Sequence, residues 1–562
     1  MDYQDLSREE LIMLVDRLVE EKRRRRYGLV WEEQEEGVEK ILRGNYPVLA
    51  EVKEREIIND KTKPMNLLIE GDNLHSLNTL LYTHREKVNV IYIDPPYNTG
   101  NKDFIYNDKM VDKEDTWRHS KWLSFMAKRL RIARELLSDD GVIFISIDDN
   151  EQAQLKLLCD EVFGEGNVLG QFVWEKNPNP TFLNKYIRSS HEYVYCYSKC
   201  KDRVSGLYET HVYEKQDDSQ PLQNKGNPMS VLEVKEGEAE LNFIENGIVP
   251  EGVYGKIKLL DDVEVVNGAN ANCFRIEGTF RFRQEYFESA VRENRKLIFK
   301  TDKMSPRLTN NIIKSKDFAP KSILKTQATT QVGVNEVNNI LGESEFSYPK
   351  PVDLIKGLLR LNRNVGAVVL DFFAGSGTTG HAVMELNKED GGNRQFILCT
   401  NNENNICEDV TYERLKRVII GYTTPKGKEV AGLGGNLKYF KTGFIEKDQD
   451  EEDLKNQFID KSLELLSIKE DTYEKLIDND SFKMNGGVDK VIGLYMDIDT
   501  NYTLLDDIQG MFDEYNVGVK KLFMPDQIDI DNDSKIEDLR NSGIEIHRVP
   551  RKIIDILEGW RK

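Results

Sequence analysis

Residues 88–97 of this chain read VNVIYIDPPY. An apolar run leads straight into Asp94, Pro95, Pro96 and Tyr97, which is how a buried strand ends at the carboxyl edge of a sheet. Open α/β sheets bind their ligands at that edge. The sequence therefore predicts that these four residues lie in a ligand site.

Strand and helix patterns alternate on both sides of this stretch. The strands predicted in the first half lie at 65–71, 88–94, 141–148 and 168–174, with helices at 72–84, 117–137 and 150–163. A second alternating stretch predicts helices at 351–362, 377–387 and 410–421 and strands at 367–373 and 395–400. Such alternation predicts an α/β fold.

The motif from Asp94 to Tyr97 suits a base that carries an exocyclic amine. The Asp94 carboxylate and the Pro95 carbonyl oxygen can each accept one N–H, which draws the nitrogen lone pair out of conjugation with the ring. Two successive prolines fix the backbone and remove amide donors. Stacking on Tyr97 would recover about 1–3 kcal/mol of the few kcal/mol that lifting a base out of a duplex costs. The alternative is an ordinary turn, because Asp and Pro favour turns.

A second motif, DFFAGSGTT at residues 371–379, is a strand followed by a tight glycine turn and a helix. Small residues there let the chain pass close to a ligand at the helix start. The motif lacks the full G-x-G-x-x-G pattern and a P-loop lysine, so S-adenosylmethionine (SAM) fits it better than NAD or ATP. Glu403, after the next strand, is the candidate for binding ribose hydroxyls. A glycine turn by itself is weak evidence for a nucleotide-type ligand.

In combination, the two motifs resemble those of the amino-group DNA methyltransferases of the circularly permuted class, in which D-P-P-Y precedes F-x-G-x-G. More narrowly, the chain resembles the modification subunits of type III restriction-modification systems. The stretches that carry this resemblance are LLIEGDNLHSL (67–77), IYIDPPYNTG (91–100), HSKWLSFMAKRL (119–130), GVIFISIDDNE (141–151), YPKPVDLI (348–355) and DFFAGSGTTGHAV (371–383). The resemblance covers about residues 27–200 and 340–445, whereas the insertion between them and the tail match the family only in position.

The resemblance implies a SAM-dependent methyltransferase core with a Rossmann-like α/β fold, an inserted target-recognition domain and a small C-terminal α/β domain. It implies that Asp94, Pro95, Pro96 and Tyr97 are catalytic, that SAM is the cofactor and that no metal is required. The residues that it assigns to the SAM site are Asp72 at the adenine ring, Lys350 and Pro351 at the methionine end, and Asp371, Phe373, Gly375 and Gly377 around the cofactor. Two alternatives stay open, because Asp72 also suits a helix N-cap and Lys350 a solvated loop.

Composition and pattern predict five regions along the chain. They are an N-terminal helical region at 1–60, the catalytic part of the core at 61–200, the insertion at 201–335, the SAM-binding part at 336–445 and the C-terminal domain at 446–562. A helix is expected over 5–26, and its basic end at 22–26 suits either phosphate contact or a solvated helix end. An acidic segment with linker character precedes C-terminal strands at 490–498, 519–525 and 544–550 and helices at 504–515, 535–541 and 551–560.

Basic and aromatic side chains are mixed in the insertion. They are Arg275, Arg281, Arg283, Arg292, Arg295, Lys296, Lys300, Lys303 and Arg307, with Phe274, Phe280, Phe282, Tyr286 and Phe299. Such mixing favours a groove that reads phosphates and base edges, and the alternative is a solvated face whose aromatic side chains form a core. Elsewhere, Trp174, Phe182 and Tyr186 are candidates to wall a flipped base, and His119 is expected to be structural.

The net charge of −20 argues against a nucleic-acid partner until its distribution is considered. Residues 447–562 hold 28 acidic and 16 basic side chains, a net of −12, so the remaining chain sits near −8 and contains the basic clusters. The six cysteines show no paired C-x-x-C spacing, which predicts reduced and mostly buried thiols. With no apolar run as long as a membrane span and no secretory signal at its start, the chain is expected in the cytoplasm.

We therefore expect a site-specific DNA methyltransferase that moves a methyl group from SAM to adenine N6 in double-stranded DNA. Within the resemblance, Asp94 favours adenine, and cytosine N4 is the nearest alternative target. A DNA-binding specificity subunit with a vestigial catalytic centre is a second alternative, against which the intact Tyr97, Gly375 and Gly377 argue. RNA or a protein amide as target would leave the basic insertion unexplained. The resemblance also implies a homodimer that recruits a restriction (helicase-nuclease) subunit, and the acidic tail is expected to serve protein association because phosphate repels it.

Overall fold

The structure is a computed structural model that describes residues 31–549 except 33–34, 61, 101–104, 107–108, 113, 181–184, 212–218, 294, 310–315, 325–327, 343–345, 347, 448–450, 480, 497–503, 525–529 and 531–532. The helices predicted at 5–26 and 551–560 lie outside the described residues. The chain divides into two compact units, one of residues 208–319 and one of the remainder. Within the described part, every helix is too short or too polar to cross a membrane.

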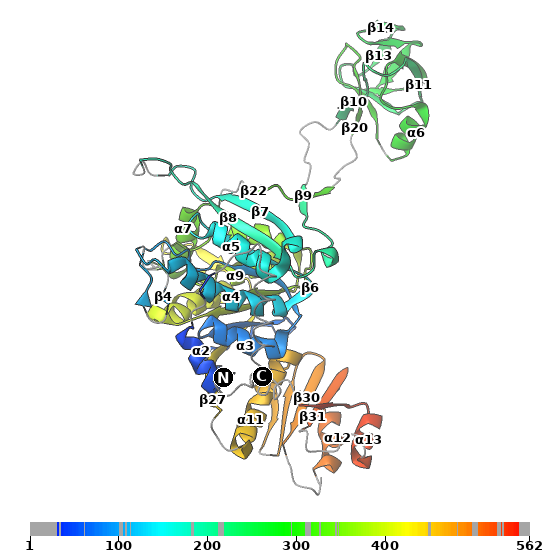
Figure 1. Cartoon of the computed structure of the whole chain (residues 1–562). Helices are drawn as coiled ribbons and strands as arrows, with labels where there is room; N and C mark the ends of the chain where they lie inside the picture. The colour runs from blue at the N-terminus through cyan, green and yellow to red at the C-terminus, as the bar shows by residue number, and fades with distance from the viewer. Residues whose placement is uncertain are drawn as a thin grey trace, which may run out of the picture. The chain divides into compact units, whose positions relative to one another are not determined.

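Ten strands form the central sheet of the larger unit (Figure 1). Their order is β1 (Asn45–Glu51), β27 (Asn436–Glu446), β2 (Met65–Glu70), β24 (Gln395–Thr400), β23 (Val368–Asp371), β3 (Val88–Ile93), β6 (Leu137–Ile147), β8 (His191–Ser198), β7 (Val168–Glu175) and β22 (Ile323–Leu324). The run from β27 to β6 is parallel, while β1 and β8 are antiparallel to their neighbours. The predicted α/β class is confirmed, although the sequence pattern did not indicate β1, β8, β22 or β27.

Helices cover both faces of this sheet. One face carries α3 (Asn73–His84), α4 (Arg118–Leu136) and α5 (Gln152–Cys159), and the other carries α7 (Thr330–Leu341), α8 (Val352–Arg360), α9 (Thr378–Asp390) and α10 (Glu413–Ile420). Leu77 and Leu130 are buried on the first face, and Leu358 and Leu415 on the second. Since burying one leucine side chain is worth about 1.5–3 kcal/mol, the two apolar layers fix the sheet firmly.

Smaller elements complete the larger unit. They are α2 (Gly37–Gly44), the pair β4 (Ile105–Tyr106) and β5 (Lys109–Met110), and the pair β25 (Gly421–Thr423) and β26 (Glu429–Ala431). The two apolar layers also contain four of the six cysteines as buried free thiols, namely Cys159, Cys196, Cys399 and Cys407. The prediction of mostly buried thiols is thus confirmed.

The two strands that carry the sequence motifs are neighbours in the sheet. β3 pairs in parallel with β23, with Val90 beside Val369 and Ile91 beside Leu370. From β3 the chain continues through α4 to β6, whereas from β23 it continues through α9 to β24 on the other side of the pair. The chain therefore leaves the two carboxyl ends in opposite directions, which opens the position where such sheets hold ligands.

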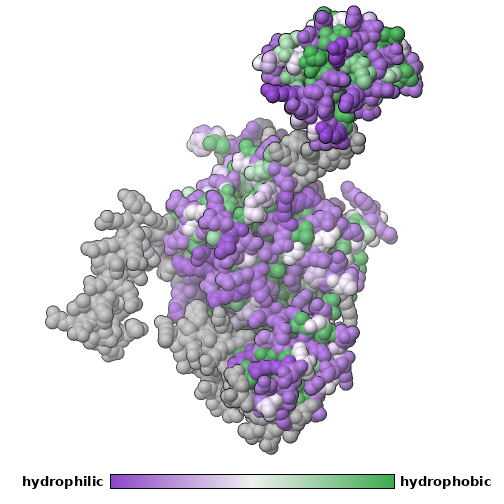
Figure 2. All heavy atoms as spheres, turned by 90° about the vertical axis from the view of Figure 1, so that its right-hand side faces the viewer, coloured by the Kyte–Doolittle hydropathy of each residue, from purple (hydrophilic) through white to green (hydrophobic). Residues whose placement is uncertain are grey.

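The smaller unit consists mainly of short strands. Its larger sheet has the order β10 (Ser219–Pro221), β20 (Pro306–Thr309), β19 (Leu297–Phe299), β12 (Ala239–Leu241), β17 (Ala269–Asn270), β16 (Val263–Val266) and β13 (Gly247–Val249). Its smaller sheet has the order β11 (Ser230–Val234), β18 (Phe274–Gly278), β15 (Ile257–Leu259) and β14 (Gly252–Tyr254). The unit also contains α6 (Gln284–Arg292) and the pair β9 (Glu209–His211) and β21 (Lys316–Phe318). Its own hydrophobic core lies beneath a mostly hydrophilic surface (Figure 2).

The aromatic residues of this unit do not share one surface. Phe274, Phe280 and Phe299 are buried in its core, as the alternative interpretation of the sequence had it. Phe282 and Tyr286 instead stack on one another outside that core, with ring centroids 4.1 Å apart. The prediction of a mixed basic and aromatic groove is therefore wrong for three of its five aromatic residues.

The C-terminal residues form a separate five-stranded sheet, shown in orange and red in Figure 1. Its strands are β28 (Glu474–Asp478), β29 (Phe482–Gly486), β30 (Lys490–Tyr495), β31 (Val519–Met524) and β32 (Glu545–Arg548), with helices α12 (Leu505–Asp513) and α13 (Ser534–Asn541). The prediction of a linker before this sheet is wrong, because α11 (Glu451–Glu470) occupies most of that segment. Leu463 and Leu466 of α11 pack with Tyr46 and Val48 of β1. The many acidic residues of the segment had obscured this apolar end of the helix.

Candidate active site

Four charged side chains and one tyrosine meet at the end of β3. The Lys350 ammonium donates to both carboxylate oxygens of Asp94 at 2.9 Å and to the Tyr97 hydroxyl at 2.8 Å. The Tyr97 hydroxyl lies 2.8 Å from Asp94 Oδ1 and 3.0 Å from Glu192 Oε2. Glu192 accepts from Lys176 at 3.0 Å and lies 3.3 Å from Lys350 Nζ. Two carboxylates are thus balanced by two ammonium groups.

Burial and ion pairing act against one another on these groups. Burial raises the pKa of the Asp94 carboxyl; the Lys350 charge opposes this shift and the Glu192 charge adds to it. Burial would also raise the pKa of Glu192, but the ammonium groups of Lys350 and Lys176 bring it below its ordinary value. Burial would lower the pKa of Lys350, yet the two carboxylates hold it above its ordinary value. Lys350 and Glu192 are therefore both charged at neutral pH.

A second group of side chains holds the backbone of the D-P-P-Y motif. The Trp122 indole N–H donates to the Pro96 carbonyl oxygen at 2.7 Å. Asn98, whose φ of 56° lies in the left-handed region, donates its amide to Glu151 Oε1 at 2.5 Å. His119 Nδ1 lies 2.7 Å from the same oxygen. His119 therefore helps to hold the D-P-P-Y motif in place through Glu151, which agrees with the structural role expected for it.

The Asp371 carboxylate holds the glycine turn at the end of β23. Its Oδ1 accepts the backbone N–H of Phe373 at 3.0 Å, and its Oδ2 accepts the Thr379 hydroxyl at 2.5 Å. Burial raises the pKa of Asp371 to about 7, against these two hydrogen bonds and with added repulsion from Asp94. The turn is therefore fixed by a group that titrates near neutral pH.

Two glycines of this turn meet both a conformational and a spatial requirement. Gly375 and Gly377 have φ values of 49° and 76°, which favour glycine. A Cβ on Gly377 would lie 3.1 Å from Thr411 Cγ2, and one on Gly375 would lie 3.2 Å from Phe346 Cζ. At these two positions before α9 no side chain covers the backbone, as a close approach by a ligand requires.

The other residues assigned to SAM lie along the same edge of the sheet. Asp72 follows β2 and is the N-cap of α3, where its side chain accepts from the Leu74 N–H at 2.7 Å. Pro351 is the N-cap residue of α8. Glu403 follows β24 with an exposed side chain. Lys350 does not lie in a solvated loop, since only 10% of its side chain is exposed.

Glu192 and Lys176 are site residues that were not expected from the sequence. Glu192 is 6% exposed although it lies in β8, a strand of mostly apolar residues, and that isolated charge was the available signal. Trp174 is buried, and its ring centroid lies 5.9 Å from Lys350 Nζ. Tyr186 is 86% exposed, and Phe182 lies outside the described residues. Of the three aromatic candidates, Trp174 is thus next to the charged cluster.

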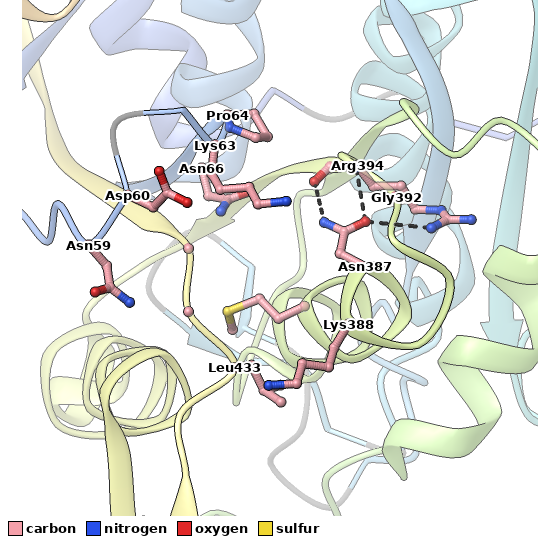
Figure 3. Close-up of a pocket in the computed structure, with 13 residues that line it drawn as sticks. Asn59, Asp60, Lys63, Pro64, Asn66, Asn387, Lys388, Gly392, Arg394 and Leu433 are labelled. Carbon is pink, nitrogen blue, oxygen red and sulfur yellow. Dashed lines mark hydrogen bonds between the residues drawn. The ribbon is translucent and has the colours of Figure 1, made fainter.

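A cavity of about 550 Å³ lies at the opposite end of the strands (Figure 3). Asn66 at the start of β2 and Arg394 before β24 line it, together with Asn387 of α9. The Asn387 side-chain amide donates its N–H to the Arg394 carbonyl oxygen and accepts the Arg394 backbone N–H at its oxygen. None of the predicted site residues borders this cavity.

Comparison with known proteins agrees with this geometry. The DNA methylase family of N6 and N4 methyltransferases matches residues 88–413, which include both motifs. The chain is 35% identical over 398 residues to the type III restriction-modification enzyme EcoPI Mod subunit of Escherichia phage P1, covering 63% of this chain and 60% of that one. It is 31% identical over 405 residues to the StyLTI Mod subunit of Salmonella typhimurium, covering 65% and 58%.

A third relative is matched over most of its own length. The type II methyltransferase M.KpnI of Klebsiella pneumoniae is 31% identical over 388 residues, which cover 67% of this chain and 90% of that one. By contrast, the match spans about three fifths of the length of the two Mod subunits. The family match extends over more than half of the chain. The chain belongs to the N6/N4 DNA methylase family.

Proposed function

We propose that this chain transfers a methyl group from SAM to the N6 amine of adenine in double-stranded DNA. The observation that carries the proposal is the adjacency of β3 and β23. Asp94 and Tyr97 follow the first strand, and the glycine turn follows the second. Group transfer requires donor and acceptor to be held side by side, and one edge of the sheet offers a place for each.

The residues at the end of β23 fit SAM. Gly375 and Gly377 leave the backbone bare, and Asp371 keeps the turn in shape. When bound, SAM supplies a methyl group activated for direct in-line displacement. Asp72, Lys350, Pro351, Phe373 and Glu403 remain the proposed additional contacts.

Asp94 and the Pro95 carbonyl are the proposed acceptors for the target amine. The Lys350 ammonium supports this role of Asp94, because a nitrogen donor already fits 2.9 Å from both carboxylate oxygens. The Trp122 indole N–H donates a hydrogen bond to the Pro96 carbonyl oxygen, whereas the Pro95 carbonyl oxygen accepts no hydrogen bond from the described residues. With its hydroxyl anchored, the Tyr97 ring is held as a surface for the extruded base.

The proposed DNA-reading surface of the insertion includes Arg281 and Arg283. Both are exposed, and they flank the stacked Phe282. Neither has a carboxylate at ion-pair distance within the described residues. Arg275, by contrast, is engaged by the Asp261 carboxylate through two hydrogen bonds, at 2.9 and 2.8 Å. Unpaired guanidinium groups beside an aromatic surface suit phosphate and base contacts.

Single-molecule sequencing of DNA from cells that express the protein tests the proposed reaction. The expected result is N6-methyladenine within one short sequence motif, and its absence with the Asp94→Ala variant. N4-methylcytosine at that motif would assign the alternative target. Unmodified DNA with a folded wild-type protein would favour the vestigial specificity subunit.

We also propose that the chain forms a homodimer that recruits a restriction (helicase-nuclease) subunit. The two Mod subunits that it resembles are named as parts of restriction-modification enzymes. Light scattering of the full chain should then give twice its 65.0 kDa mass. A mass of one chain at micromolar concentration would contradict the dimer.

A further inference from the structure

Glu192 is a buried charge without a role in the reaction described so far. It is 6% exposed, and its oxygens contact Tyr97, Lys176 and Lys350. Taking a carboxylate out of water costs several kcal/mol, which ion pairing repays only in part. A buried glutamate beside the acceptor of the target amine therefore requires an explanation.

Lys350 and the target amine compete for the same acceptor. Lys350 occupies both oxygens of Asp94, so an amine that donates to Asp94 has to displace the ammonium. The displaced ammonium stays in a site where 10% of its side chain is exposed, and it needs another anion. Glu192 Oε2 is already 3.3 Å from Lys350 Nζ. Among the described residues, Asp94 and Glu192 are the carboxylates within ion-pair distance of Lys350.

We infer that Glu192 is a positioning residue. It becomes the ion-pair partner of the Lys350 ammonium when the target amine reaches Asp94. The exchange frees the acceptor without leaving an unpaired ammonium in the site. Lys176 remains on the other oxygen of Glu192 and holds the carboxylate in place. This inference rests on the proposed function, because it assumes an amine at Asp94.

The variant Glu192→Gln tests the exchange. Lys350 then has no second anion, so single-turnover methyl transfer should slow by about tenfold or more, while SAM affinity stays within about threefold. Glu470→Gln is the matched control, since Glu470 is also nearly buried and also accepts from two lysines, Lys490 and Lys521, at 2.8 and 2.9 Å. The control should lose similar thermal stability but keep the wild-type rate.

The double variant Glu192→Gln/Lys176→Met tests whether the changed net charge of the cluster, and not the loss of the Glu192–Lys350 pair, slows the reaction. It removes one charge of each sign and leaves the Asp94–Lys350 pair, so it should fold and remain as slow as the single variant. Recovery of the wild-type rate in the double variant would overturn the exchange. A Glu192→Gln rate within threefold of wild type, or a parallel loss of SAM affinity, would overturn it as well. If the wild type itself transfers no methyl group, the proposed function fails instead.

Discussion

The buried carboxylate of Asp371 ends the strand beside the one that Asp94 follows, and the negative charge of Asp94 helps to raise its pKa. Leu370 lies next to Ile91 in the parallel pair β3 and β23, so two motifs distant in sequence meet at one edge. Their proximity has a measurable consequence. A cofactor that carries positive charge should bind according to the ionisation of Asp371.

Asp371→Asn should remove a pH dependence of SAM binding. The Asp371 pKa is about 7, so the carboxyl is mostly neutral at pH 6 and mostly ionised at pH 8. Because SAM is a sulfonium cation, its affinity for the wild type should rise across this interval, and calorimetry at several pH values measures it. The Asn variant should show a flat profile over the same interval. An equal slope in both proteins would exclude Asp371 as the source.

Glu151→Gln should flatten the pH dependence of stability. Burial raises the pKa of Glu151 from 4.5 to about 8, with the Asn98 hydrogen bond and the Arg118 charge opposing the shift and Asp148 adding to it. Between these values the folded chain binds a proton that the unfolded chain has lost, so stability falls as pH rises through this window. In thermal melts, the Tm of the variant relative to that of the wild type should therefore rise from pH 5 to pH 8.5. Glu161→Gln, at an exposed glutamate, is the control that should keep the wild-type slope.

Gly377→Ala should weaken SAM binding more than it weakens folding. Its φ of 76° and the contact at 3.1 Å with Thr411 Cγ2 mean that a methyl group strains and fills the turn. Gly391→Ala is the matched control, because Gly391 ends the same helix with a φ of 71° and has open space around it. Both variants should lose about 1–2 kcal/mol of stability from left-handed backbone strain. If the two lose SAM affinity equally, the turn is not the cofactor site.

Arg281→Ala and Arg283→Ala should each weaken DNA binding and lower its salt dependence. Each lost phosphate contact reduces the slope of log affinity against log salt by about 1. Arg275→Ala should leave both quantities near wild type, since Asp261 already neutralises that side chain. Titration of a fluorescent duplex at several salt concentrations measures them. A larger effect from Arg275→Ala than from the other two variants would contradict the placement of the DNA-reading surface at Arg281 and Arg283.

The sequence predicted the central strands and the two motifs because their signals are local. The apolar run before Asp94 predicts a buried strand, and the glycines after Asp371 predict a tight turn. The sequence left an N-cap at Asp72 open as an alternative to cofactor contact, and in the structure Asp72 is the N-cap of α3. In contrast, the acidic residues of α11 obscured its helical pattern. The apolar residues of this helix, such as Leu463, pack against a strand near the other end of the chain.

The charged cluster could not be predicted, because its contacts depend on the fold. Lys350 lies 256 residues from Asp94 in sequence, and Glu192 lies 95 residues from Tyr97. No periodicity relates such positions. The family resemblance places Lys350 at the methionine end of SAM, which stays a prediction, and it gave no indication that the Lys350 ammonium pairs with Asp94.

In the proposed reaction, Asp94 binds the target amine and does not contact the cofactor. The most direct measurement is single-turnover transfer of a labelled methyl group from SAM to unmethylated DNA, with SAM affinity determined on the same preparations of wild type and Asp94→Ala. We expect transfer by the wild type, loss of transfer by at least about a hundredfold in the variant, and SAM affinities within about threefold of each other. A variant that still transfers the methyl group, or that loses SAM affinity together with transfer, would contradict this role of Asp94.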